Sequence, residues 1–302
     1  MAPEVTFTAV RVYNSKLAII SAVSDDLAED NVDHSIVFTW SAGKWTKKPV
    51  PNAVVALCSV AQPAPQMFSI CAAGQVLVAS RTGFENEMVD ESAEGPSPLV
   101  PLRTAQAIGA QIHVAGMARR VYRRSGLGTW EPIDNGVFVP RNERREGIGF
   151  LCIDGAGLSD ITAAGYKGEI WYYNGRGWTK QESPTNLALN TLRYREDGLV
   201  YIAGMAGTII RGAVNAWEGI PQQVTEDDFW GSAIFKGIPY FASGRAIYRL
   251  IGNNLEKVNL EALGPITTGH LDCDSEVLWS AGAKHLASTR DGSTWEAISG
   301  PA

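Results

Sequence analysis

The chain has 302 residues, of which 45% are hydrophobic and 19% charged, so it can bury a large core and does not have the composition of a disordered protein. Its net charge of −6 lacks the basic excess that is typical of nucleic-acid-binding proteins, so no nucleic-acid partner is predicted. No apolar run is long enough to span a membrane, and the N-terminus lacks the basic and apolar segments of a secretory signal.

The first predicted repeat covers residues 6–51 and contains four short strands. Its first strand covers 6–15, the small residue Ala22 lies near the end of the second, and the large apolar residue Trp45 opens the fourth. An acid-rich insertion at 24–33 lengthens the connection, which we place between the second and third strands. We interpret Ala22 and Trp45 as the two anchors of a repeat.

The same anchors recur six more times along the chain. The copy at 148–183 is the clearest, because four strands and their tight turns fit into about 38 residues, the size of one propeller blade. The later anchor pairs, separated by 13 to 15 residues, are Ala73 and Met88, Ala115 and Trp130, Ala164 and Trp178, Ala203 and Trp217, Ala242 and Leu255, and Ala281 and Trp295. This nearly constant separation fixes the third strand and its turns. We expect the large residue to cover the gap to the next blade.

Seven such units account for nearly the whole chain, which predicts one all-β domain, a seven-bladed β-propeller of four-stranded antiparallel blades. The expected blades cover about 6–51, 52–97, 100–138, 146–184, 188–224, 229–263 and 266–302. Because the chain starts with a first strand and ends with a fourth, the ring is predicted to close between whole blades. No blade is then shared by the two termini.

The turn at 288–295 reads S-T-R-D-G-S-T-W and resembles the Asp-box, or BNR, repeat of sialidase-like propellers, S-x-D-x-G-x-T-W. Arg290 stands where the aspartate is expected, and Asp291 is one place late. Looser versions occur at 125–130 and 174–178, and these turns are also similar to those of tectonin-like lectins. The resemblance implies a propeller of the superfamily that includes WD40 and YVTN repeats. It implies a structural role for the turn, and the sialidase catalytic residues are not matched.

The cysteines and histidines indicate no metal site, because none has the spacing of a ligand pair, and no cofactor motif is present. The cysteines have apolar neighbours, so we expect buried, reduced thiols and a cytoplasmic protein. These residues are Cys58, Cys71, Cys152, Cys273, His34, His113, His270 and His285.

The predicted first strands, which line a propeller axis, are mostly apolar. Only Arg193, Arg195 and His270 stand out, which is too few for an active site, so the sequence predicts no catalytic residue and favours no enzyme. A glycosidase-like pair of loop carboxylates remains open. Two function classes follow. The first is a protein-binding propeller that acts by occupying its partner, as an inhibitor, a toxin-immunity protein or an assembly chaperone. The alternative is a glycan-binding lectin or a sialidase-like glycoside hydrolase.

Two kinds of connection, those between strands two and three and those between blades, emerge on one face of a propeller. All long segments of this sequence fall on that face, which we call the long-loop face, and we expect it to bind another protein. The first two blades supply an acidic sector from the insertion at 24–33 and a connector at 84–97: Asp25, Asp26, Glu29, Asp30, Asp33, Glu87, Asp90 and Glu91. The third and fourth supply a basic sector: Arg119, Arg120, Arg141, Arg144 and Arg145.

Overall fold

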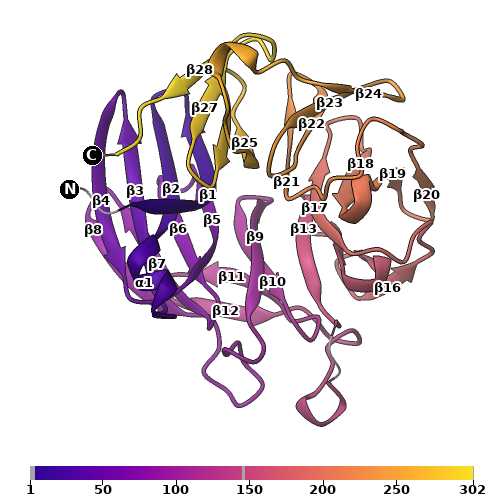
Figure 1. Ribbon diagram of the computed structural model, residues 1–302. Coiled ribbons are helices and arrows are strands. Elements are labelled where there is room, and N and C mark those ends of the chain that lie inside the picture. Colours follow the sequence, from indigo (N-terminus) through magenta and orange to yellow (C-terminus); the bar gives the residue numbers. More distant parts are fainter. Residues whose placement is uncertain (1–3, 145–146, 302) are drawn as a thin grey trace.

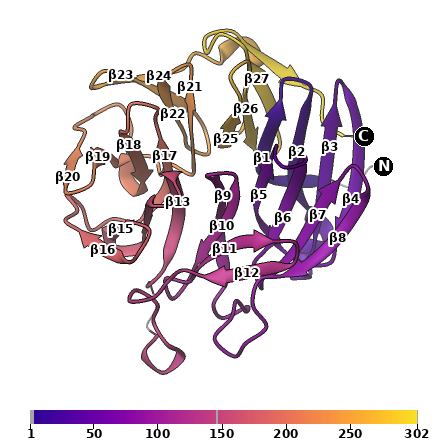
Figure 2. The same ribbon diagram turned by 180° about the vertical axis from the view of Figure 1, so that it is seen from behind.

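The computed structural model describes residues 4–144 and 147–301, which form seven four-stranded antiparallel sheets around a central axis (Figures 1 and 2). Each sheet contains four consecutive strands in chain order, with the first nearest the axis. The predicted seven-bladed propeller is therefore confirmed, and so is closure without a shared blade. No helix in the described residues is long and apolar enough to cross a bilayer.

The first four blades contain these strands: β1 (Val5–Asn14), β2 (Leu17–Ser24), β3 (Ser35–Ser41) and β4 (Lys44–Val50); β5 (Val54–Val60), β6 (Gln66–Cys71), β7 (Gln75–Ser80) and β8 (Gly83–Met88); β9 (Leu102–Ile108), β10 (Gln111–Gly116), β11 (Val121–Gly126) and β12 (Thr129–Pro132); β13 (Phe150–Gly157), β14 (Asp160–Gly165), β15 (Ile170–Tyr173) and β16 (Trp178–Gln181).

The last three blades contain these strands: β17 (Leu189–Tyr194), β18 (Val200–Gly204), β19 (Ile209–Ala213) and β20 (Ala216–Gly219); β21 (Gly231–Phe235), β22 (Ile238–Ala242), β23 (Ile247–Ile251) and β24 (Asn254–Lys257); β25 (Gly269–Cys273), β26 (Leu278–Gly282), β27 (Leu286–Thr289) and β28 (Trp295–Ile298). The helical turns are α1 (Asp25–Glu29), η1 (Arg141–Glu143), η2 (Tyr166–Gly168), η3 (Met205–Gly207) and η4 (Glu261–Leu263).

Three of the tryptophans near the start of a fourth strand form a hydrogen bond to a neighbouring blade. The indole N–H of Trp178 donates to the carbonyl of Ile133 in the third blade at 2.7 Å. Trp130 donates to Glu87 in the second blade, and Trp45 donates to the carbonyl of Ser299 beyond the last blade. In all three cases the neighbour is the preceding blade. The expectation that these side chains cover the gap to the next blade was therefore wrong in direction.

The second blade departs from the predicted anchors. Met88 ends β8 instead of opening it, and Phe84 takes the place of the tryptophan, opposite Ala79 as Trp178 is opposite Tyr173. The small pair assigned to β6 lies in the following turn, where Gly74 has a φ of +94°. Both anchors were misplaced together, because the small residues of this turn resemble a strand end in the sequence.

The ring closes through side chains of the first and last blades. Asp272 accepts hydrogen bonds from the backbone N–H of Val12 at 2.6 Å and from Arg11 at 3.3 Å. Arg11 also donates to the hydroxyl of Ser59 in the second blade at 3.0 Å. The closure therefore joins three consecutive blades near the axis.

Asp291 stabilises the turn between β27 and β28. Its carboxylate accepts hydrogen bonds from the backbone N–H groups of Ser293 and Thr294, both at 2.7 Å, and this lowers the pKa of Asp291. Gly292 supplies the φ of +78° that the turn requires. In this chain, the aspartate of the turn has a structural role.

Candidate partner-binding face

The long-loop face holds the extended connections of the molecule. The loops that follow β8 and β12 extend beyond the ring at the lower edge of Figure 1. They cover residues 89–101 and, in the described part, 133–144 and 147–149. A third long connector, 220–230, lies between β20 and β21. On the opposite face, the turns are mostly of two to five residues.

The acidic insertion forms the short helix α1, between β2 and β3 as expected. Asp25 is engaged within the molecule. It accepts a hydrogen bond from Thr6 at 2.7 Å and pairs with Lys284 of the seventh blade, and these contacts lower its pKa. The remaining predicted acids of the insertion are exposed and form no ion pair with the described residues: Asp26, Glu29, Asp30 and Asp33.

Glu87 does not lie in a surface connector, so its predicted location is corrected. It lies in β8 with its side chain only 2% exposed. There it accepts hydrogen bonds from Arg124, the N–H of Gly128 and the indole of Trp130. Burial alone would raise the pKa of Glu87, but these hydrogen bonds lower it. Glu85 lies in the same strand, whereas Asp90 and Glu91 follow it.

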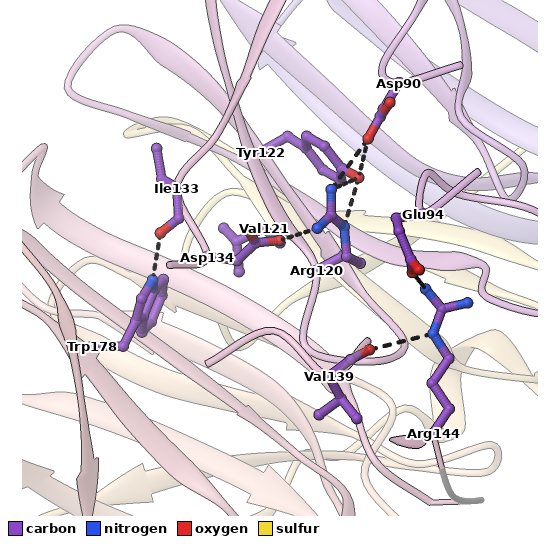
Figure 3. Close-up of polar contacts among 10 residues, drawn as sticks. All are labelled: Asp90, Glu94, Arg120, Val121, Tyr122, Ile133, Asp134, Val139, Arg144 and Trp178. Carbon is purple, nitrogen blue, oxygen red and sulfur yellow. Dashed lines mark hydrogen bonds and ion pairs between the residues drawn. The ribbon is translucent and has the colours of Figure 1, made fainter. Parts of the chain in front are cut away.

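Arg120 is buried between the two long loops (Figure 3). Its guanidinium lies 3.1 Å from Asp90 and 3.2 Å from Asp134, and it covers the rings of Tyr122 and Phe138. Tyr122 donates to Asp90 at 2.8 Å. Burial raises the pKa of Asp134, although the charge of Arg120 opposes this shift. The pKa of Asp90 is lowered, because its hydrogen bonds and the charge of Arg120 outweigh the effect of burial.

Two further arginines of the predicted basic sector are engaged with carboxylates. Arg144 lies 2.5 Å from Glu94, so it joins the loops at 89–101 and 133–144 (Figure 3). Arg119 binds both carboxylate oxygens of Glu169, at 2.6 and 2.7 Å, and covers the ring of Trp171. Arg141 is exposed, and Arg145 lies outside the described residues. These pairs neutralise much of the charge that the sequence assigned to a basic sector.

The charge of the long-loop face is therefore predominantly negative. Counted over the described residues, its connections hold 16 acidic and 7 basic side chains. The turns of the opposite face hold 5 acidic and 6 basic side chains. The acidic excess of the protein is thus concentrated on one face. Such asymmetry steers the association of an oppositely charged partner.

Sequence reasoning did not identify the connector 220–230 as part of this face. Its residues 226–230 read E-D-D-F-W, and Trp230 is 52% exposed, the most exposed of the nine tryptophans. Trp230 immediately precedes β21, the first strand of the sixth blade. The preceding acidic run was the available signal, because such a run precedes no other predicted first strand.

Polar residues of several inner strands lie close together near the axis, where the charges of Asp272 and Asp154 both act on Arg11. Arg195 pairs with Asp197 in the β17–β18 turn of the opposite face. Burial raises the pKa of Asp154, which is opposed by the charge of Arg193. Burial lowers the pKa of His270 to about 4, so its imidazole is neutral at pH 7. In residues 4–144 and 147–301, no group of histidine, cysteine and acidic side chains could hold a metal ion.

These features define a seven-bladed propeller whose long loops form an acidic, internally braced face. No protein-family model matches the chain. It is 35% identical over 287 residues to the immune protein Tsi7 of Pseudomonas aeruginosa, covering 93% of both proteins. The chain therefore belongs to the family of Tsi7.

Solved structures with little sequence identity share the fold. An inactive virginiamycin B lyase from Staphylococcus aureus, solved with quinupristin, has a TM-score of 0.76 at 12% identity, over 95% of both chains. YCF48 bound to a D1 peptide has a TM-score of 0.69 at 11% identity, over 94% of this chain and 91% of that one. The WD40 propeller of Doa1 has a TM-score of 0.71 at 9% identity, over 95% and 93%. These similarities concern the fold alone.

Proposed function

We propose that this protein is a non-catalytic immunity protein, which neutralises a toxin protein by binding it through the long-loop face. The observation that carries the proposal is the similarity to the immune protein Tsi7 along nearly the whole of both chains. A propeller can neutralise a partner by occupying its surface, without any chemical step of its own. The four free thiols fit a reducing compartment, and we place the protein in the cytoplasm.

The geometry of the loops supports this assignment to the long-loop face. Arg120 and Arg144 hold the loops at 89–101 and 133–144 against each other. A braced loop loses less conformational entropy on binding than a free one, so more of the contact energy contributes to affinity. The exposed partner-contacting residues we propose are Asp26, Glu29, Asp30, Asp33, Glu91 and Arg141, with the paired residues supporting them.

A stoichiometric titration tests the function. The partner is captured from the source cell on the tagged protein, identified by mass spectrometry, and produced alone to establish its toxicity. Its activity is then measured with increasing amounts of the immunity protein. A binding mechanism predicts a linear loss of activity that ends at one equivalent. The absence of a toxic protein among the captured partners would contradict the proposal.

The same titration separates binding from catalysis. An enzyme that modified the toxin would inactivate it progressively at far less than one equivalent. His270→Ala provides the matched variant, because His270 is the histidine of an inner strand. Binding through the loops predicts an unchanged end point for this variant. Progressive inactivation that is lost in His270→Ala would establish an enzyme instead.

A further inference from the structure

Trp230 is a bulky apolar side chain placed in solvent beside the propeller axis. It immediately precedes β21, the innermost strand of the sixth blade (Figure 2). Its backbone N–H donates to the carbonyl of Ala242 at 2.9 Å, which fixes its position. Within the described residues its indole makes no hydrogen bond and no ring contact, in contrast to Trp45, Trp130 and Trp178. The backbone therefore fixes the position of this indole, while the indole itself makes none of these contacts within the described residues.

Two exposed apolar side chains, one before β17 and one after β18, lie on the same face. Met205 is 41% exposed and Leu187 is 37% exposed. The N–H of Met205 donates to the carbonyl of Ala188 at 3.0 Å, and the N–H of Phe229 donates to the carbonyl of Gly204, also at 3.0 Å. These bonds connect the segments that bear Leu187, Met205 and Trp230. We call these three residues the Trp230 strip.

Carboxylates of the connector 220–230 border the Trp230 strip. Glu226 is exposed and forms no ion pair with any described residue. Asp228 accepts a hydrogen bond from the N–H of Ala206 at 2.8 Å, beside Met205. Asp227 accepts one from Ser243 at 3.2 Å. Arg245 lies in the turn after β22, whereas the connector 220–230 holds three acidic and no basic side chains.

The connector is held rigid by its own hydrogen bonds. The side-chain amide of Gln222 donates to the carbonyls of Gly207 and Thr225, and its oxygen accepts from the N–H groups of Val224 and Thr225. Thr225 in turn accepts from the N–H of Asp227 at 3.0 Å. The aromatic and acidic groups are thus preorganised, which is the condition under which an exposed tryptophan becomes an energetic anchor of an interface.

We propose that the Trp230 strip and Glu226 bind a basic protein surface with an apolar recess that takes the indole. Charge complementarity selects this occupant, because the described loops of the long-loop face hold 16 acidic against 7 basic side chains. A second copy of the chain would bring two acidic faces together and is disfavoured. That the partner with this basic surface is a toxin rests on the proposed function.

Peptide display tests this binding chemistry without knowledge of the toxin. A random peptide library on phage is selected against the intact protein, and selected peptides are synthesised and titrated. The inference predicts peptides in which lysine or arginine flanks an apolar residue. Trp230→Ala should weaken their binding about 30-fold, and Glu226→Lys roughly tenfold at low salt. Both variants should keep the wild-type unfolding temperature, because the two side chains are exposed.

Matched variants on the opposite face complete this experiment. Leu127→Ala removes another exposed apolar side chain, and Glu196→Lys makes the same change in net charge as Glu226→Lys. Neither should alter peptide affinity. Enrichment of acidic or neutral peptides, equal losses in the variants of both faces, or self-association through Trp230 would overturn the inference.

Association kinetics with the captured toxin separate this inference from the proposed function. Binding to a basic surface predicts that association slows between about 20 and about 500 mM NaCl, and that Glu226→Lys reduces this salt dependence. A tight complex that is indifferent to salt, Glu226→Lys and Trp230→Ala would refute the inference and leave the immunity function intact. If the protein binds basic peptides at Trp230 but neutralises no toxin, the inference is supported and the immunity function is refuted.

Discussion

Burial decides which charged residues of this protein can meet a partner. Glu87 and Glu91 are four positions apart in one acid-rich segment, and the sequence assigned both to the interface. Glu87 is enclosed by Arg124 and Trp130 of the next blade, whereas Glu91 is exposed. Those contacts come from residues about 40 positions away, and their geometry depends on the register of two neighbouring blades. The local sequence does not carry that information.

The Glu87 ion pair gives a test at this scale. Glu87→Gln leaves Arg124 in a largely buried site without its counter-ion, so we expect a loss of about 3 kcal/mol at pH 7. The folded-state pKa of Glu87 is lowered, so its contribution is complete above the ordinary glutamate pKa and is lost as the pH falls through the lowered value. The difference from wild type should therefore shrink in acid.

Urea unfolding of both proteins at neutral and acidic pH measures this difference. Glu91→Gln is the control, because an exposed side chain without an ion pair should change stability by less than about 0.5 kcal/mol. A Glu87→Gln protein as stable as wild type at neutral pH would show that the buried pair contributes nothing.

The thiols provide a second test at the residue scale. Burial raises the pKa of Cys58 and Cys71 to about 11 and that of Cys152 to about 12. Since the thiolate is the reactive form, these cysteines should resist iodoacetamide at pH 8 in the folded protein and react quickly in denaturant. Mass spectrometry of the alkylated peptides follows each site. Rapid labelling of Cys152 in the native protein would contradict its described burial.

At the scale of elements, the sequence predicted regular blades better than irregular ones. The repeat of small and large anchors located the fourth strands of six blades, because it follows directly from strand length and turn length. The second blade was misread, since Met88 gives the expected spacing while Phe84 occupies the equivalent position. The pairing of the two long loops was beyond sequence reasoning. Arg120 pairs with Asp90 and Arg144 with Glu94, so each partner lies 30 or 50 positions away along the chain.

Arg120 is expected to control the order of both long loops. Arg120→Met leaves Asp90 and Asp134 without their shared cation, and we expect a loss of about 3 kcal/mol, with amide exchange at 89–101 and 133–144 faster by at least about tenfold. Hydrogen–deuterium exchange with mass spectrometry measures the effect. Arg176→Met, in an exposed turn of the opposite face, is the control. Unchanged exchange in both loops would mean that Arg120 does not brace them.

At the scale of the whole molecule, the acidic long-loop face and the face of short turns lie on opposite sides of the ring. The seven-blade count and the position of the long loops were predictable, because both depend on spacing along the chain. The predicted division into acidic and basic sectors, in contrast, did not anticipate that Arg119, Arg120 and Arg144 are paired with carboxylates. Similarity to Tsi7 gives the family, and the position of the charge suggests how a member could recognise its partner.

A hydrogen–deuterium exchange footprint of the toxin complex tests the central claim most directly. The account predicts that toxin binding slows exchange in α1 and in the loops at 89–101, 133–144 and 220–230. Turns of the opposite face, such as 195–199 and 290–294, should exchange as in the free protein. Protection confined to that opposite face would contradict the assignment of the long-loop face as the partner-binding site.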